Sequence, residues 1–265
     1  MNNSLVLQYE NDGYYSPLDV VSEEAALQYR NELESIEQQH GALHYQYKLH
    51  TFKQFPLQLA SSPHLLDAVE ALIGPDILLY NTTFVIKEAG SDAHVSWHQD
   101  LTYWGLDSDA QVSAWIALTE VTEANGCMYM IPGSHKEGMR EHCTTNDKNN
   151  VLLNGQTIRN VDESKSTPVL LRPGQASLHH GWTMHTSMPN RSGDRRIGLN
   201  IQYLATSVKQ LQSDKDTAVL VRGEDKFNHF GVDITATRSF DLAGMQRQQA
   251  LSEHIKSITT AQANS

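Results

Sequence analysis

Five short apolar runs lie in the middle of the chain, and this pattern constrains the fold more than any other feature. They are rich in Val, Ile, Leu and aromatic residues, and Gly, Pro, Asn or Asp separate them. In order, they read "ILLYNTTFVIK", "QVSAWIALTEV", "CMYMIPGS", "TPVLLRPGQASLHH" and "RRIGLNIQYLA". Runs of this kind at irregular spacing predict strands of a sandwich or barrel rather than a βαβ alternation.

Helices are predicted on both sides of these strands. Residues 22–41 begin with Ser22 as a candidate N-cap, carry two glutamates in the first turn and place apolar residues along one face. Residues 62–74 begin with Ser62 and Pro63 and stop at Gly74, which frames a second helix. The segment 245–265 predicts a terminal helix with a frayed tail.

The length of 265 residues predicts a single domain. We divide it into an N-terminal helical part (1–75), a β-core (76–210) and a C-terminal extension (211–265). Within the β-core, residues 136–167 are polar and form a long excursion. A connection of that length in a compact domain is usually a functional lid or disordered.

Composition excludes some partners. The 31 acidic and 20 basic residues give a net charge of −11, which disfavours nucleic acid and anionic lipid. The amino terminus has no basic region followed by an apolar core, and no stretch reaches the roughly 20 apolar residues of a membrane span. Only Cys127 and Cys143 are present, and without metal-type spacing they predict reduced thiols in the cytoplasm.

The sequence "WHQD" raises the possibility of a metal site. In an extended strand, His98 and Asp100 point to the same face, so both can reach one ion. A third ligand must come from elsewhere, and "LHHGWTMHTSMPNRS" offers His179, His180 and His185. Two imidazoles and one carboxylate form the facial triad of non-haem Fe(II) oxygenases, which leaves positions open for cosubstrate and dioxygen.

An arginine follows in a position that suits such a site. Arg196 comes eleven residues after His185, inside a strand-like run. A guanidinium matches a carboxylate bidentately. Arg196 is therefore a good anchor for the far end of a dicarboxylate whose other end chelates iron.

The motifs "SWHQDLTYW", "MYMIPGSH" and "GQASLHHGWTMHTSMPNRSGDRR", in this order, resemble the phytanoyl-CoA dioxygenase family over roughly residues 20–205. These are Fe(II)- and 2-oxoglutarate-dependent oxygenases, which use O2. The resemblance implies a mainly β fold with flanking α-helices and a double-stranded β-helix core, the cupin-like jelly roll. It also implies that His98, Asp100 and His185 are the catalytic metal ligands and that Arg196 binds the distal carboxylate of 2-oxoglutarate.

Further residue roles are implied by the same resemblance. Trp115 matches an indole that lines the cosubstrate pocket, and Lys48 and Thr83 are looser matches to residues near 2-oxoglutarate. Family members that halogenate have Ala or Gly in place of the aspartate. The carboxylate of Asp100 therefore implies hydroxylation or another oxidation.

The remaining histidines and aromatic residues have simpler interpretations. Because the triad is complete without them, His94, His135, His179 and His180 are not expected to be ligands. His135 and His180 are candidates for supporting the ligands or lining the pocket. Tyr103 and Trp104 either pack in the core or form an aromatic wall of the substrate pocket. We expect Tyr103, Trp104, His135 and the excursion 136–167 to govern selectivity.

The function implied is hydroxylation of an unactivated C–H bond, with release of succinate and CO2. The scarcity of basic residues near the motifs disfavours a CoA ester and favours a small polar metabolite or natural-product intermediate as the small-molecule substrate. Two alternatives stay open: a non-catalytic sensor of metal and 2-oxoglutarate, and a zinc-dependent hydrolase on the same triad. The hydrolase would leave Arg196 without a role. The sequence leaves the oligomeric state open.

Overall fold

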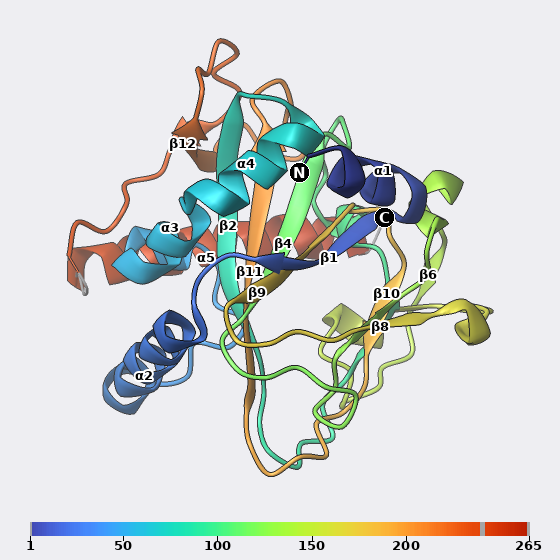
Figure 1. Cartoon of the computed structure of the whole chain (residues 1–265). Coiled ribbons are helices and arrows are strands. Elements are labelled where there is room, and N and C mark those ends of the chain that lie inside the picture. Colours follow the sequence, from blue (N-terminus) through green and yellow to red (C-terminus); the bar gives the residue numbers. More distant parts are fainter. Residues whose placement is uncertain (1, 239–241, 264–265) are drawn as a thin grey trace.

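The computed structural model describes residues 2–238 and 242–263 and contains two antiparallel β-sheets that face each other as a jelly roll (Figure 1). The predicted fold class is confirmed. The order of strands in the major sheet is β1 (Tyr14–Asp19), β9 (Gln175–His179), β4 (Gln111–Ala117), β11 (Arg196–Ala205), β2 (Ile77–Lys87), β12 (Thr217–Arg222) and β13 (Gly231–Val232), of which only β12 and β13 pair in parallel. The order in the minor sheet is β3 (Val95–His98), β10 (His185–Ser187), β5 (Met128–Met130) and β8 (Thr167–Val169).

Alternation along the central strands separates the two faces of the major sheet. On β11, Ile197, Leu199 and Ile201 belong to the main apolar core, which also contains residues of the N-terminal helices. Side chains at even positions of the same strand point to the opposite face, toward the minor sheet. They include Arg196, Asn200 and Gln202, so polar groups line the interior of the jelly roll.

Helices cover the outer face of the major sheet. They are α1 (Asn2–Asp12), α2 (Glu23–His40), α3 (Gln54–Ala60) and α4 (Pro63–Ile73). Figure 1 shows α4 lying over the strands of this sheet. Their burial against the sheet supplies the hydrophobic stabilisation that the short helices would lack on their own.

The signals at the helix ends act largely as predicted. Ser22 caps α2 by accepting a hydrogen bond from the backbone N–H of Ala25 (3.2 Å). Ser62 occupies the cap position of α4, but its side chain makes no capping bond. The terminal helix α5 spans Leu242–Ala263, and residues 264–265, where fraying was predicted, lie outside the described residues. None of the described helices has the length and apolar character needed to cross a membrane.

The predicted boundaries need correction at both ends of the β-core. The N-terminal part is not only helical, because β1 pairs with β9 at the edge of the major sheet. Its sequence "YYSPLD" contains a proline, which edge strands tolerate but which weakens the strand signal. The C-terminal extension also contributes a strand, since β12 pairs with β2. Only one residue of β12 is fully buried, so its sequence lacks a strong apolar pattern.

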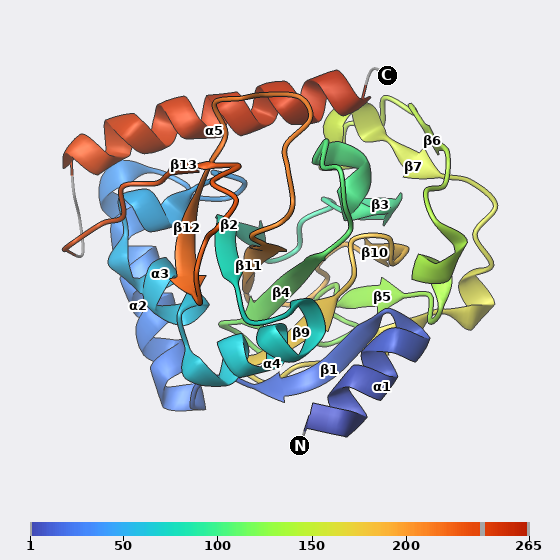
Figure 2. The same ribbon diagram turned by 90° about the horizontal axis from the view of Figure 1, so that it is seen from above.

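The polar excursion 136–167 is ordered against the minor sheet and α5. It contains the hairpin β6 (His142–Cys143) with β7 (Thr157–Ile158), and three short 3-10 helices, η3 (Ser134–Glu137), η4 (Leu153–Gly155) and η5 (Glu163–Lys165), lie in or next to it. The amide of Asn150 donates to Ser96 Oγ (2.9 Å) on β3. The amide of Gln156 donates to the carbonyl of Ala263 (2.8 Å) near the end of α5. Figure 2 shows the end of α5 close to β6 and β7.

Candidate functional site

A cavity of about 630 Å³ lies between the two sheets. Its inner walls are the interior faces of β2, β4, β9 and β11 and the strands β3 and β10 of the minor sheet. Residues 151–153 of the excursion and one face of α5 complete the lining. A cavity of this size is in the range of sites that bind small organic molecules.

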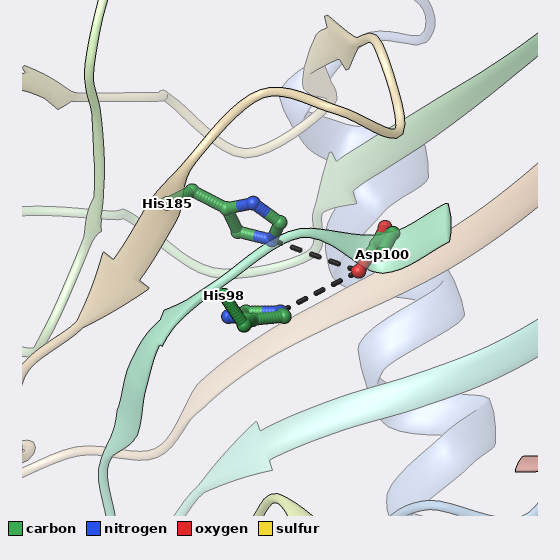
Figure 3. A group of neighbouring side chains, drawn as sticks. All are labelled: His98, Asp100 and His185. Atoms are coloured by element: carbon green, nitrogen blue, oxygen red, sulfur yellow. Dashed lines mark ion pairs between the residues drawn. The ribbon is translucent and has the colours of Figure 1, made fainter. Parts of the chain in front are cut away.

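The three predicted ligands come together at this cavity. His98 is the last residue of β3, and His185 is its partner on β10. Asp100 begins the 3-10 helix η2 (Asp100–Tyr103). The Nε2 atoms of His98 and His185 lie 3.4 Å and 3.8 Å from Asp100 Oδ1, as Figure 3 shows. Among the described residues, these three form the one group of His, Cys, Asp or Glu side chains arranged to hold a metal ion.

The residue between the ligands keeps them on one face. Gln99 is extended (φ −127°, ψ 127°), so the strand alternation continues one residue beyond β3. Its buried side chain turns away and donates to the carbonyls of Gly138 (2.8 Å) and Trp182 (2.7 Å). Gln99 Oε1 also accepts from the backbone N–H of Arg140 (2.7 Å). These bonds fix the backbone that aims His98 and Asp100 at the same point.

Both histidine ligands are held in the tautomer that suits metal binding. The Nδ1 of His98 lies 2.9 Å from the carbonyl of Ser96, and the Nδ1 of His185 lies 2.9 Å from the carbonyl of Thr183. A carbonyl oxygen only accepts, so each Nδ1 carries the hydrogen and each Nε2 directs its lone pair toward Asp100. Burial, together with the nearby His98, holds the pKa of His185 well below its ordinary value. A neutral imidazole is the form that binds a metal.

The carboxylate ligand is held from the major sheet. Asp100 Oδ2 accepts from Ser113 Oγ (3.0 Å) and from His179 Nε2 (3.3 Å). Ser113 and His179 are direct partners on β4 and β9. Burial raises the pKa of Asp100, but the hydrogen bond from His179 and the other imidazoles outweigh it and hold that pKa well below the usual range. Oδ2 is thus occupied, and Oδ1 is left for a metal ion.

We expect His179→Leu to weaken divalent-metal binding by about 10–100-fold, the usual effect of losing a residue that orients a ligand. The reason is that Asp100 Oδ2 would lose one of its two donors. His179→Gln can still donate to Oδ2 and should retain most of the affinity. Anaerobic titration with Co(II), followed by visible absorption, measures both variants. Equal affinity of His179→Leu and the wild type would show that this bond does not position Asp100.

Arg196 is a buried cation without an acidic partner. It is 1% exposed, and Nη1 donates to the carbonyl of Gly126 (2.6 Å). Its Nε has no hydrogen-bond partner, and no Asp or Glu in the described part of the chain pairs with it. Burial lowers the pKa of Arg196 to about 10, which leaves it charged at neutral pH. An unpaired buried charge is unfavourable, so this guanidinium fits an anionic ligand in the cavity.

Trp115 and Thr83, which were predicted for the cosubstrate pocket, line the same cavity as Arg196. The guanidinium carbon lies 5.0 Å from the centre of the Trp115 ring. Trp115 lies over Gly198, where a Cβ would come within 1.8 Å of the indole, so only glycine fits there. In the same cross-strand row, Thr83 and Asn200 line the cavity, and their Oγ1 and Oδ1 atoms are buried without a partner. These atoms are available to a ligand.

Two of the predicted site residues do not line the cavity. Lys48 is fully buried, and its Nζ donates to Asp233 Oδ2 (3.0 Å) and to the carbonyl of Thr217 (2.5 Å). The carboxylate that holds it comes from the distant C-terminal segment, which the sequence could not reveal. His135 lies under α1, with Nε2 3.2 Å from the carbonyl of Glu10. Both proposed roles at the cavity are therefore corrected.

Tyr103 and Trp104 are placed where either of the two alternatives is possible. Both are buried in an apolar cluster, and both line the cavity. The hydroxyl of Tyr103 is buried without a partner. Two histidines that were not expected to be metal ligands lie next to aspartates instead. His94 lies 3.5 Å from Asp147, and His180 lies 3.7 Å from Asp109.

Sequence reasoning missed several residues that line the cavity. They are Tyr45 and Tyr47 from the segment after α2, Leu152 and Leu153 from the excursion, and Ile255, Lys256 and Ile258 from α5. The spacing of Ile255 and Ile258 indicates a buried helix face. It does not reveal which surface that face meets.

A family profile and several known proteins match this chain. The sequence profile of the phytanoyl-CoA dioxygenase (PhyH) family matches residues 9–198. Residues of this chain are 34% identical over 151 positions to a probable alpha-ketoglutarate-dependent hypophosphite dioxygenase of Stutzerimonas stutzeri, covering 56% of this chain and 52% of that protein. They are 27% identical over 146 positions to the peroxisomal phytanoyl-CoA dioxygenase of Homo sapiens, covering 53% and 43%. The chain thus matches about half the length of these relatives.

A solved structure matches nearly the whole chain. The non-haem monooxygenase ThoJ in its apo form superposes with a TM-score of 0.85 at 29% identity, covering 98% of this chain and 99% of that one. The likeness therefore includes β12 and α5, beyond the residues that the family profile matches.

Proposed function

Because the chain belongs to the phytanoyl-CoA dioxygenase family, we propose that it is an Fe(II)- and 2-oxoglutarate-dependent dioxygenase. Its reaction is hydroxylation of an unactivated C–H bond of a small polar metabolite or natural-product intermediate. One observation carries the proposal: a His-Asp-His group with free lone pairs lines the same cavity as a buried guanidinium that has no acidic partner among the described residues. The first suits a metal ion, and the second suits the far carboxylate of a dicarboxylate.

When bound, Fe(II) and 2-oxoglutarate supply the oxidising chemistry, in which substrate, 2-oxoglutarate and O2 give hydroxylated substrate, succinate and CO2. The protein holds and orients the reactants. His98, Asp100 and His185 are the residues that would bind Fe(II). Arg196 would bind the distal carboxylate of 2-oxoglutarate through its planar fork, while Trp115 and Thr83 line that end of the pocket.

The apolar side chains that line the cavity also have a role in this proposal. Leu152, Leu153, Ile255 and Ile258 border the cavity. Apolar side chains around a bound substrate exclude water and strengthen the electrostatic interactions inside. They would keep the oxidising chemistry directed at the substrate.

The hydrolase alternative explains fewer of the observed features, and turnover distinguishes the sensor alternative from an enzyme. A zinc hydrolase needs two histidines and a carboxylate, but it has no use for a buried arginine that lacks an acidic partner among the described residues. A binding protein without turnover could use both features. It would differ from the proposed enzyme in leaving 2-oxoglutarate unconverted under O2. The carboxylate at position 100 also favours hydroxylation over halogenation.

Localisation and partners follow from the same proposal. Cys127 and Cys143 are free thiols, as expected of a protein in the reducing cytoplasm, where we place this enzyme. Its partner is a small molecule that fits the cavity. The net charge of −11 disfavours nucleic acid.

Anaerobic absorption spectroscopy tests the proposal. Addition of 2-oxoglutarate to the Fe(II)-loaded protein should produce a weak charge-transfer band in the visible region. Succinate, which lacks the 2-oxo group needed for chelation, should not produce the band and serves as the control. Exposure to O2 should then convert 2-oxoglutarate to succinate. Bound Fe(II) without a band would remove the 2-oxoglutarate proposal and leave the zinc alternative, whereas a band without formation of succinate under O2 would support the sensor alternative.

A further inference from the structure

The outer part of the cavity is built by a segment that the family profile does not match. That profile ends at residue 198, whereas α5 begins at Leu242. Ile255, Lys256, Ile258, Thr259 and Thr260 of α5 nevertheless line the cavity together with residues 151–153. Figure 2 shows α5 running along one side of the jelly roll. The three candidate metal ligands and Arg196 therefore lie within the residues that the family profile matches. The lining residues of α5 lie outside that match.

Side-chain and backbone bonds hold α5 in place at the cavity. The amide of Gln248 donates to the carbonyl of Tyr47 (2.5 Å), and Ser252 Oγ accepts from the backbone N–H of Tyr47 (3.3 Å). At the other end, Gln156 donates to the carbonyl of Ala263 (2.8 Å). Because Tyr47 itself lines the cavity, the helix is fixed directly to the cavity wall. Its lining residues are thus positioned well enough to select a substrate.

The size and lining of the cavity favour a substrate with an apolar body. The volume of about 630 Å³ exceeds what an ion and a five-carbon dicarboxylate need. Ile255 and Ile258 face the remaining space, as do Leu152, Leu153 and Trp104. Burying apolar substrate surface against these side chains would be a main source of binding free energy.

The charges around the cavity favour an acidic substrate over an amine. Among the described lining residues, Asp100 is the only acidic one, and it belongs to the metal group. Arg196 and Lys256 are the lining cations. With Arg196 assigned to 2-oxoglutarate, Lys256 is the lining cation that remains for the substrate. It is exposed and makes no ion pair with any residue that the structure describes. A buried ammonium group of a substrate would find no carboxylate here.

We propose that the substrate is an acidic molecule whose apolar body lies against α5 and Leu152–Leu153 and whose acidic group faces Lys256. This inference rests on the proposed oxygenase function and narrows the substrate class of that same site from polar metabolites in general to acids with an apolar body. It makes α5 the element that determines specificity, and Lys256 the residue that selects for charge.

Three matched fluorescent probes test the proposal: 4-(2-naphthyl)butanoate, the corresponding primary alcohol and the corresponding primary amine. Binding is measured anaerobically, by probe fluorescence, on protein loaded with Fe(II) and 2-oxoglutarate. We expect the acid to bind about tenfold more tightly than the alcohol, a difference typical of one charge pair near a surface, and the amine to bind most weakly. Lys256→Gln should make the acid and the alcohol equal, and Lys256→Glu should reverse the order of acid and amine.

Two further variants separate charge from apolar contact. Ile258→Ala should weaken all three probes alike, because it removes apolar surface without changing charge. Lys226→Glu alters an exposed lysine that does not line the cavity and should change nothing. Tightest binding of the amine, an unchanged order in Lys256→Glu, or no binding of any probe would overturn the proposal. The charge-transfer band, recorded on the same samples, distinguishes these outcomes from a failure of the oxygenase function itself, which would show as loss of the band.

Discussion

Replacing His185 with alanine is expected to lower Fe(II) affinity by more than about 100-fold and to abolish 2-oxoglutarate turnover. The loss should exceed that caused by a residue that only orients a ligand, because one of three donors to the ion disappears. Its Nε2 lies 3.8 Å from Asp100 Oδ1, and the centre of its ring lies 4.0 Å from that of His98. Anaerobic Fe(II) titration and succinate release under O2 measure the two effects.

A histidine outside the cavity, His94, provides the control for His185→Ala. His94 is half-buried, lies 3.5 Å from Asp147 and does not line the cavity. His94→Ala should therefore bind Fe(II) and turn over 2-oxoglutarate like the wild type. The His-Asp-His assignment would be wrong if His185→Ala kept wild-type Fe(II) affinity.

Residues whose role depends on local pattern could be predicted from the sequence. The central strands β2, β4 and β11 are buried on both faces, so they appear as runs that are mostly apolar or β-branched, with a few polar residues among them. His98 and Asp100 share a face because one extended residue separates them. Arg196 could be predicted because it opens β11 on the same face as Asn200, toward the interior.

Residues whose role depends on long-range pairing could not be predicted from the sequence. Lys48 has the charge of a cosubstrate ligand, but Asp233, 185 residues away, holds its ammonium group. The strands β1 and β12 lie toward the margins of the major sheet and carry too few buried residues to show an alternating pattern. The contact between α5 and the cavity depends on tertiary packing, which a helical periodicity does not specify.

The two residues that donate hydrogen bonds to Asp100 show how strand register creates a site that spacing along the sequence does not reveal. Ser113 and His179 are 66 residues apart and come from different motifs. They become direct neighbours because β4 pairs with β9, and both then donate to one carboxylate oxygen. A shift of one residue in this register would turn one of the two side chains to the opposite face and remove its hydrogen bond to Asp100.

Arg196→Met is expected to lower the affinity for 2-oxoglutarate by about 100-fold or more while Fe(II) binding remains. Losing one partner of a buried charge pair typically costs about 3–5 kcal/mol, which corresponds to that factor or more. The same change should not destabilise the ligand-free protein, because the guanidinium has no acidic partner among the described residues. Replacing an unpaired buried charge with an apolar side chain of similar length removes a desolvation penalty. Titration of the charge-transfer band gives the affinity, and urea unfolding of the ligand-free protein gives the stability.

The adjacent arginine provides the matched control for Arg196→Met. Arg195 points to the outer surface, where its guanidinium donates to Glu88 and Glu37 (2.8–3.1 Å). Arg195→Met should leave the affinity for 2-oxoglutarate unchanged, although both variants lose one positive charge at neighbouring positions. Arg196→Lys retains the charge without the planar fork and should bind 2-oxoglutarate with intermediate affinity. If Arg196→Met and Arg195→Met bound 2-oxoglutarate equally well, Arg196 would not be the anchor, and the buried guanidinium would need another anionic partner.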